Sequence, residues 1–471
     1  MSRLLVAIGA LVLVGGLGPA PHLDATAVAE EVERDAGRME EQEALRFRAE
    51  MGLASDPVTV RASYSDRATY SSDEFGLPLT ATENAELLRR AGVQRAAGAA
   101  VEVASRQATY GGAYTDQLAG GVPVFTFTGE PERYAAEIAQ ALPKGVAFRL
   151  ERVARSFEAL RAAQARVGER WDALEKEGID VSSTGIRTDI NALDIGVTGL
   201  TPAIEERLQR EFGPGLIIRE EGPAQADACN SVHDCRPIKG GLEIRSQYND
   251  GECTSGFIVK RVSTGSVYVL TAGHCIAVNG GYDKKWEHND PNGTSNAFGW
   301  SRYETWVNGG SSLADVGLIT ISSDEIPTRK NEIYVGGGVV ETIVGLDYWP
   351  NQKVGDIALM FGQTGGDYAG TITRQLVAND STVDGIGTMR VTETMQVSFN
   401  PDRGDSGGPV FYPHPDGGGK RIALGTHVHS DDGTSSVTGD GWYSPYDRGD
   451  ADMIRVHGVS WDYSLCVTAS C

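Results

Sequence analysis

Gly404-Asp405-Ser406-Gly407-Gly408-Pro409 is the stretch that decides how this sequence folds and what chemistry it can perform. The glycines around Ser406 let the backbone turn tightly and leave the hydroxyl open to approach. A serine hydroxyl is a weak nucleophile unless an imidazole takes its proton and a carboxylate fixes the tautomer of that imidazole. The segment therefore directs attention to a histidine and an acid elsewhere in the chain.

Both residues are found upstream, in Thr271-Ala272-Gly273-His274-Cys275 and Ala314-Asp315-Val316-Gly317-Leu318. His274 follows an apolar run and precedes a cysteine, so we expect its position to be rigid. Asp315 stands at the head of another apolar run, which would bring it into a cleft. The chain order His, Asp, Ser is one of the few that this chemistry adopts. We predict Ser406 as nucleophile, His274 as general base and Asp315 as the group that orients the base.

The same serine also satisfies the G-x-S-x-G pattern of the α/β-hydrolases. That fold requires the order Ser, acid, His and several strand–helix units after the serine. Only 65 residues follow Ser406, and they are rich in Gly and Asp rather than helical in pattern. The sequence therefore argues against an α/β-hydrolase.

The three motifs resemble those of the trypsin/chymotrypsin-like serine proteases, particularly the secreted bacterial enzymes related to α-lytic protease and the streptogrisins. The resemblance covers about residues 238–465, including Gly240-Gly241 and Cys253-Thr254-Ser255-Gly256-Phe257. It implies an all-β domain of two antiparallel six-stranded β-barrels with the site between them. It also implies a serine endopeptidase that works through an acyl-enzyme, without a cofactor, and an oxyanion hole formed by the amides of Gly404 and Ser406. The alternative is a catalytically inactive protease-fold binding or adhesion protein.

The chain of 471 residues divides near residue 228, since all six cysteines follow that point. Upstream, charged helical patterns alternate with short strands and predict an α+β domain, whereas short strands between Gly, Asn and Asp turns dominate downstream. We expect a signal peptide at 1–27, a helical polar segment at 28–106, an α+β pro-domain with a processing segment at 107–228 and a protease domain at 229–471. Upstream strands are predicted at Val122–Thr128, Val146–Leu150, Leu193–Val197 and Leu216–Arg219, and helices at Pro131–Leu142, Val153–Leu174 and Pro202–Phe212.

The N-terminus is typical of a secretory signal. Arg3 precedes an apolar run from Leu4 to Leu17, too short to span a bilayer comfortably, and Ala25-Thr26-Ala27 offers a cleavage site. The formal net charge of −22 argues against binding to nucleic acid or anionic lipid. We predict a secreted, extracellular monomer that acts on proteins or peptides and does not associate with membranes once the signal is cleaved.

The upstream half resembles the propeptides of the same bacterial proteases. The resemblance implies that it assists folding and inhibits the protease until it is cut away. The segment Glu220-Glu221-Gly222 is a position at which an enzyme specific for acidic residues could cut itself. Two alternatives remain: an independent binding domain, or an inhibitor that never leaves.

Six cysteines allow 15 disulfide connectivities, so the sequence alone does not fix the pairing. Nearness along the chain suggests Cys229–Cys235, Cys253–Cys275 and Cys466–Cys471. The middle pair also matches the disulfide that ties the histidine loop to the preceding strand in the resembled family. No C-x-x-C spacing occurs, so we predict no metal site.

Substrate preference depends on the positions flanking the nucleophile. Asn400 stands where trypsin-like members have an aspartate, so a preference for Arg or Lys is not supported, although Asp402 could still reach the pocket. His427 falls on the strand that pairs with substrate, at the position where glutamyl endopeptidases of this family have a histidine. An imidazolium is a suitable partner for an acidic side chain. Small or aromatic preferences are the alternatives. Asp405 is expected to be structural rather than catalytic.

Overall fold

The computed structural model describes residues 41–66, 68–72, 74–221, 224–225, 238–248, 251–289, 295–322, 331–336, 339–431, 440–457 and 463–466. The predicted signal peptide and Cys229, Cys235 and Cys471 lie outside these ranges. Of the described cysteines, Cys253 and Cys275 are joined to each other, and Cys466 is also disulfide-bonded. The pairs Cys229–Cys235 and Cys466–Cys471 stay predictions. In the described part of the chain, every helix is too short or too polar to cross a membrane.

The N-terminal half begins with three helices and a small sheet. The helix α4 starts at a capping box, in which Thr80 and Glu83 each bond to the other's backbone N–H. One face of α4 packs on a three-stranded sheet of order β1-β2-β3. The elements are α2 (Glu41–Glu50), α3 (Pro57–Ser65), α4 (Ala81–Ser105), β1 (Tyr110–Asp116), β2 (Val122–Phe127), η1 (Pro131–Tyr134), α5 (Ala135–Ala141) and β3 (Arg149–Arg152).

A second unit of the N-terminal half packs helix α6 on three further strands. Of the residues predicted to form one stripe of this helix, Leu160, Val167, Trp171 and Leu174 are buried against the sheet and Phe157 is partly buried. The predicted start at Val153 is wrong, because the helix begins at Phe157 after its N-cap Ser156. Helix α7 has the predicted bounds, whereas strands β1 and β4 were not predicted. The elements are α6 (Phe157–Lys176), β4 (Asp180–Arg187), β5 (Ala192–Thr198), α7 (Pro202–Phe212), β6 (Leu216–Glu220) and β7 (Ala224–Gln225).

The C-terminal half begins with a fully antiparallel sheet of order β24-β10-β11-β15-β13-β12-β8-β9. This sheet differs from the predicted six-stranded barrel, because in the described residues it has eight strands, one of them added from the C-terminus when β24 pairs with β10. The strands are β8 (Glu243–Ser246), β9 (Glu252–Thr254), β10 (Ile258–Arg261), β11 (Val267–Thr271), β12 (Lys285–Asn289), β13 (Ser295–Glu304), β15 (Gly317–Thr320) and β24 (Tyr463–Leu465).

The second barrel has the predicted six antiparallel strands. They follow the order β20-β23-β22-β21-β18-β19, and the pairing of β19 with β20 closes the ring. The strands are β18 (Ile357–Gly362), β19 (Gly366–Val383), β20 (Gly387–Val397), β21 (Pro409–Pro413), β22 (Lys420–Asp431) and β23 (Gly441–Pro445). The remaining elements are α8 (Gly273–Val278), β14 (Ser311–Ser312), β16 (Glu332–Tyr334), β17 (Val340–Leu346), η2 (Trp349–Asn351) and α9 (Tyr446–His457).

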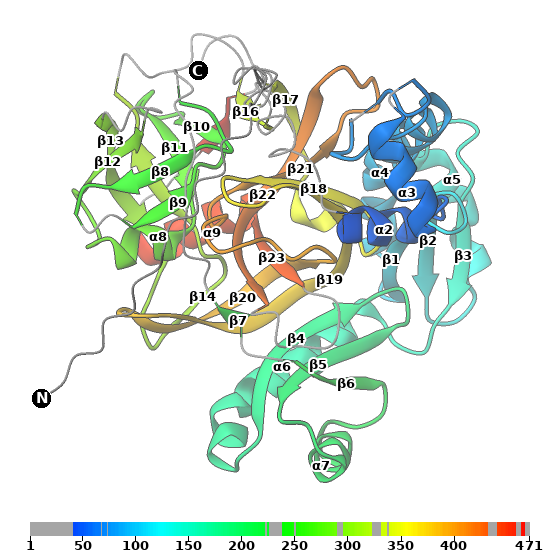
Figure 1. The fold of residues 1–471 in the computed structure, drawn as a ribbon. Helices are drawn as coiled ribbons and strands as arrows, with labels where there is room; N and C mark the ends of the chain where they lie inside the picture. Colours follow the sequence, from blue (N-terminus) through cyan, green and yellow to red (C-terminus); the bar gives the residue numbers. More distant parts are fainter. Residues whose placement is uncertain are drawn as a thin grey trace, which may run out of the picture.

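The two halves share one continuous sheet. Strand β4 of the N-terminal half pairs antiparallel with β19 of the second barrel, so the barrel strands run on into β5 and β6. Figure 1 shows this extension below the long β19–β20 hairpin, with the helices α2–α4 and the sheet β1–β3 against the side of the barrel. The N-terminal half is therefore docked on the second barrel rather than separated from it.

Candidate active site

The predicted base and its orienting acid lie side by side because their strands are neighbours. Strand β11 ends at Thr271, which pairs with Gly317 at the start of β15, and His274 and Asp315 flank this pairing. His274 Nδ1 lies 2.6 Å from Asp315 Oδ2, and the His274 backbone N–H donates to Asp315 Oδ1 at 2.9 Å. A carboxylate can only accept, so Nδ1 bears the hydrogen and Nε2 is left available as a base.

The second barrel fixes Asp315 from the other side. The backbone N–H of Asp315 donates to Ser444 Oγ of β23 at 3.0 Å. Asp315 has no exposed surface, and His274 is 2% exposed. The pair is therefore held at the junction of the two sheets, where low exposure strengthens the interaction between imidazole and carboxylate.

The loop that presents Ser406 depends on its glycines. Gly407 has φ +95°, and a Cβ there would lie 2.2 Å from the carbonyl oxygen of Thr254. Thr254 also braces the loop, since its N–H donates to the Ser406 carbonyl and its Oγ1 donates to the Gly404 carbonyl, both at 2.8 Å. The Gly407 N–H donates to the carbonyl of His427 at 2.9 Å. The first sheet and β22 thus hold this loop from both sides.

Asp405, predicted to be structural, has both carboxylate oxygens engaged within the fold. It accepts from the Thr364 N–H and the Tyr368 hydroxyl at 2.8 Å each, and from the Asp402 N–H at 3.0 Å. Its side chain has no exposed surface. The backbone N–H of Asp402 belongs to this cluster, and the side chain of Asp402 is exposed.

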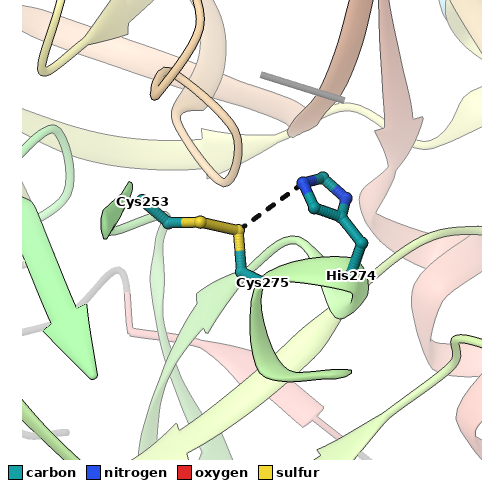
Figure 2. A group of neighbouring side chains, drawn as sticks. All are labelled: Cys253, His274 and Cys275. Atoms are coloured by element: carbon teal, nitrogen blue, oxygen red, sulfur yellow. Dashed lines mark hydrogen bonds between the residues drawn. A yellow bond between two sulfur atoms is a disulfide. The ribbon is translucent and has the colours of Figure 1, made fainter. Parts of the chain in front are cut away.

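The side chain of Ser406 donates to the Val428 carbonyl at 3.5 Å. Both Ser406 and His274 belong to the described residues, and no hydrogen bond joins them in this structure. His274 Nε2 lies 3.7 Å from Cys275 Sγ (Figure 2). Catalytic hydrogen bonds are often long in free enzymes and tighten when substrate binds. The arrangement brings the predicted base and its predicted orienting acid into contact, with the predicted nucleophile on a separate loop.

One group of side chains in the described part of the chain has ligand atoms close enough to hold a metal. Cys253, His274 and Cys275 place these atoms within 4.8 Å of one another. Cys253 and Cys275 form a disulfide, however, as Figure 2 shows. Thiolates bind metals. These residues therefore do not fit a metal site, and the disulfide instead anchors the histidine helix α8 to β9.

His427, one of the two predicted specificity residues, contacts the loop of the predicted nucleophile. His427 is 1% exposed, and its backbone N–H donates to the Gly408 carbonyl at 2.9 Å. Burial lowers the pKa of His427 to about 4, while the negative charge of Asp405 opposes this and His274 adds to it. Asn400 is half-buried, and its Oδ1 has no partner among the described residues. At neutral pH, therefore, His427 is a neutral imidazole in the free protein.

Sequence reasoning did not give roles to four further residues at the site. His429 stacks on Trp442 with ring centroids 5.1 Å apart, and it accepts a hydrogen bond from the side-chain amide of Asn379. Trp306 places its indole against His274 in an edge-on contact, with centroids 6.1 Å apart. The only sequence signal for Trp306 was its position nine residues before Asp315. Its contact with His274 joins residues that are distant in the sequence, so no local pattern could predict it.

The end of the N-terminal half also reaches this region. Strand β7 pairs antiparallel with β22, where Gln225 is opposite Ser430 and Ala224 is opposite Asp431. It pairs in parallel with β19 at Thr382. Strand β22 is the one that bears His427, so the N-terminal half occupies the edge of the strand expected to bind substrate.

Comparison with known proteins relates the C-terminal half of the chain to a known protein family. The family model described as "Trypsin" matches residues 230–447, a range that includes His274, Asp315 and Ser406. Serine protease 2 of Streptomyces fradiae is 31% identical over 174 residues, which are 37% of this chain and 87% of that protein.

Three solved structures that match this chain are described as proteases. A glutamic-acid-specific serine protease, described as using a histidine triad in substrate binding, is 22% identical with a TM-score of 0.36, covering 48% of this chain and all of its own. A Nocardiopsis protease is 22% identical with a TM-score of 0.34, covering 48% of this chain and 98% of its own. An α-lytic protease homologue is 22% identical with a TM-score of 0.32, covering 44% of this chain and 92% of its own.

Proposed function

Because this chain belongs to the trypsin family and is a serine endopeptidase, we propose that it is made as a secreted precursor whose N-terminal half inhibits the protease until it is removed. The observation that carries this proposal is the pairing of β7 with β22 beside the nucleophile loop. A peptide substrate of this family is expected to pair with the same strand. A chain segment already bonded there would compete with substrate.

The docking of β4 on β19 supports the same proposal. Arg374 of β19 is 2% exposed and contacts Ser183 of β4, Asp194 of β5 and Glu221, with the two carboxylates 3.9 and 3.6 Å away. Arg219 also pairs with Glu221, at 2.8 Å. A buried charge cluster loses its partners when either side is removed, so the two halves depend on each other.

This cluster bears on where maturation can occur. Glu221 is 2% exposed, and its backbone N–H donates to the Val197 carbonyl at 3.1 Å. A protease needs an accessible, extended segment. Cleavage after Glu221 would therefore have to follow release of this segment from β5.

The chemistry that we propose uses the site residues as follows. Ser406 Oγ attacks the scissile carbonyl while its proton passes to His274 Nε2, and Asp315 stabilises the imidazolium that forms. The amides of Gly404 and Ser406 hold the oxyanion. The imidazolium then protonates the leaving amine, and water activated by His274 hydrolyses the acyl-enzyme.

The test compares secreted full-length protein with its Ser406→Ala variant on a mixture of peptides, read by mass spectrometry. Ser406→Ala should reduce turnover by about 10⁶-fold and leave the precursor uncut. Mass spectrometry of the parent should reveal a new N-terminus near residues 222–228 and the loss of the upstream half. Equal inactivity of both proteins after the N-terminal half is removed would instead favour an inactive protease-fold binding protein.

We further propose that the enzyme prefers acidic residues before the cleaved bond. His427 is the support, since it is buried and its backbone bonds to Gly407 and Gly408 of the nucleophile loop. Its pKa near 4 means that it meets a substrate carboxylate either as a neutral N–H donor or by taking up a proton on binding. Asn400 is neutral, so it would add no charge beside an acidic substrate side chain.

Matched fluorogenic peptides test this preference, differing only in Glu, Gln, Phe or Ala before the cleaved bond. The parent should favour Glu over Gln by about tenfold or more, since one charged hydrogen bond is worth about 1.5–3 kcal/mol. His427→Gln should remove most of that difference without abolishing turnover of the Ala peptide. Equal rates on Glu and Gln would reject the acidic preference and leave the endopeptidase itself intact.

A further inference from the structure

Glu304 is a buried carboxylate behind the candidate active site that the mechanism above does not use. It is the last residue of β13 and lies opposite Gly317, two residues after Asp315 in the chain. Its Oε2 accepts a hydrogen bond from the backbone N–H of Trp306, so the side chain folds back over the turn that follows the strand. The hydroxyl of Tyr282 forms a further hydrogen bond to it.

This turn presents Trp306 to the catalytic histidine. The Trp306 ring is 8% exposed and meets the His274 imidazole edge-on, with an interplanar angle of 72°. Met389 and Val391 of β20 form an apolar cluster with Trp306. The next backbone N–H, that of Val307, contacts Met389 Sδ at 3.1 Å. Glu304 therefore holds one end of a turn whose tryptophan is clamped between the β19–β20 hairpin and His274.

In the described part of the chain, no cationic side chain forms an ion pair with the Glu304 carboxylate. Burial raises the pKa of Glu304 to about 7, the Trp306 N–H bond opposes this, and the charge of Asp315 adds to it. His457 of α9 donates to the Glu304 backbone carbonyl at 2.8 Å rather than to its carboxylate. Other ionisable groups on the packed elements include Tyr303, the Arg302–Asp283 pair and the Asp452–Arg455 pair. Helix α9 also carries Tyr446, Asp447, Arg448 and Asp450, and β12 carries Lys285, Glu287 and His288.

We propose that Glu304 is a positioning residue for the proton-transfer step, acting on His274 through Trp306 and through its own negative charge beside Asp315. When the proton of Ser406 moves to His274 Nε2, the imidazole becomes a cation. A second buried negative charge behind Asp315 favours that cation, because charges interact strongly in a poorly solvated site. The hydrogen bond to Trp306 keeps the imidazole from tilting away.

The state of Glu304 then sets part of the pH dependence of catalysis. Below its pKa the carboxyl is neutral and the additional charge is absent. As pH rises through about 7 the charge appears and the rate of acylation rises. This inference requires only that the chain is an active serine endopeptidase, so it does not depend on the precursor or acidic-preference proposals.

The decisive variant is Glu304→Gln, produced as the full chain and normalised to active sites by titration with a fluorophosphonate. Glutamine keeps an oxygen that can accept the Trp306 N–H but removes the charge. We expect kcat at pH 8.5 to fall by about three- to tenfold with KM nearly unchanged, and the difference from the parent to vanish near pH 5.5. A purely structural role predicts equal pH profiles for the parent and Glu304→Gln, and that result would overturn the proposal.

Two further variants keep the test decisive if Glu304→Gln folds poorly. Tyr282→Phe removes a hydrogen bond that stabilises the ionised carboxylate, and Tyr282 is 47% exposed, so folding should be unaffected. We expect the rising limb of the pH profile to move to higher pH in this variant, and the rate at pH 9 to equal that of the parent. Asp283→Asn removes an exposed carboxylate from the same neighbourhood and should leave the profile unchanged. An unshifted limb in Tyr282→Phe would also reject the proposal.

Discussion

Arg374 in β19 donates from both terminal guanidinium nitrogens to Ser183 Oγ in β4, at 3.1 and 3.0 Å. These two residues join the protease to its N-terminal half across 191 positions of the sequence. Ser183 also donates to Glu221, so one hydroxyl connects the buried guanidinium to the end of the N-terminal half. The Ser183 hydroxyl thus adds a buried side-chain contact to the backbone pairing of β4 with β19.

Ser183→Ala should therefore loosen the shared sheet. A hydrogen bond to a charged group contributes about 1.5–3 kcal/mol, and Arg374 stays buried without it. We expect the amides of β4 and β19 to exchange hydrogen about tenfold faster or more in a Ser406→Ala background. Ser182→Ala is the matched control, because Ser182 Oγ lies 3.5 Å from Glu221 and does not contact Arg374. Equal exchange in the two variants would show that the hydroxyl does not hold the interface.

Asp315→Asn should reduce kcat by about 10⁴-fold while KM changes little. The amide oxygen can still accept the His274 backbone N–H, but its NH₂ group would face Nδ1 and favour the wrong tautomer. Asp452→Asn is the control, since Asp452 is equally buried and its Oδ2 accepts the neighbouring Ala314 N–H at 3.4 Å. It should affect stability more than kcat. A small loss of kcat in Asp315→Asn would assign the orienting role to another residue.

Burial of His427 predicts a loss of stability in acid. The folded pKa is about 4, below the ordinary value of 6.5, so the folded state resists protonation. Above pH 6.5 this contribution to the free energy of unfolding is fully present. It is lost as the pH falls from 6.5 through about 4, because the unfolded state binds the proton first, and the loss amounts to about 3 kcal/mol. His427→Gln in a Ser406→Ala background should flatten the decline of the thermal midpoint over this range. If the thermal midpoints of the two proteins decline in parallel, protonation of His427 does not destabilise the fold.

Removal of the Cys253–Cys275 disulfide should loosen the histidine helix. The bond closes a separation of 22 residues, which is worth about 3 kcal/mol on the chain-entropy model. The double alanine variant should exchange the amides of α8 faster and lose kcat, because His274 adjoins Cys275. Unchanged exchange of α8 would show that Asp315 alone holds the histidine.

Local patterns predicted much of the fold. The bounds of α7 were predicted to the residue, because a proline at the first helical turn is a short-range signal. Strand β4 was missed because its sequence is rich in Ser, Thr and Gly and lacks a clear alternation. Its identity as a strand depends on its partners β5 and β19.

The sequence by itself determined the chemistry of the site, because the histidine, aspartate and serine motifs each impose a local backbone and their order restricts the fold. Only the tertiary structure decided that β24 joins the first sheet and that β7 pairs with β22. It also decided that Trp306 contacts His274 and that Glu304 bonds to the backbone of Trp306. These contacts join residues far apart in the chain. The packing and charge of the completed fold determine these contacts. A short stretch of sequence has no periodicity that could predict them.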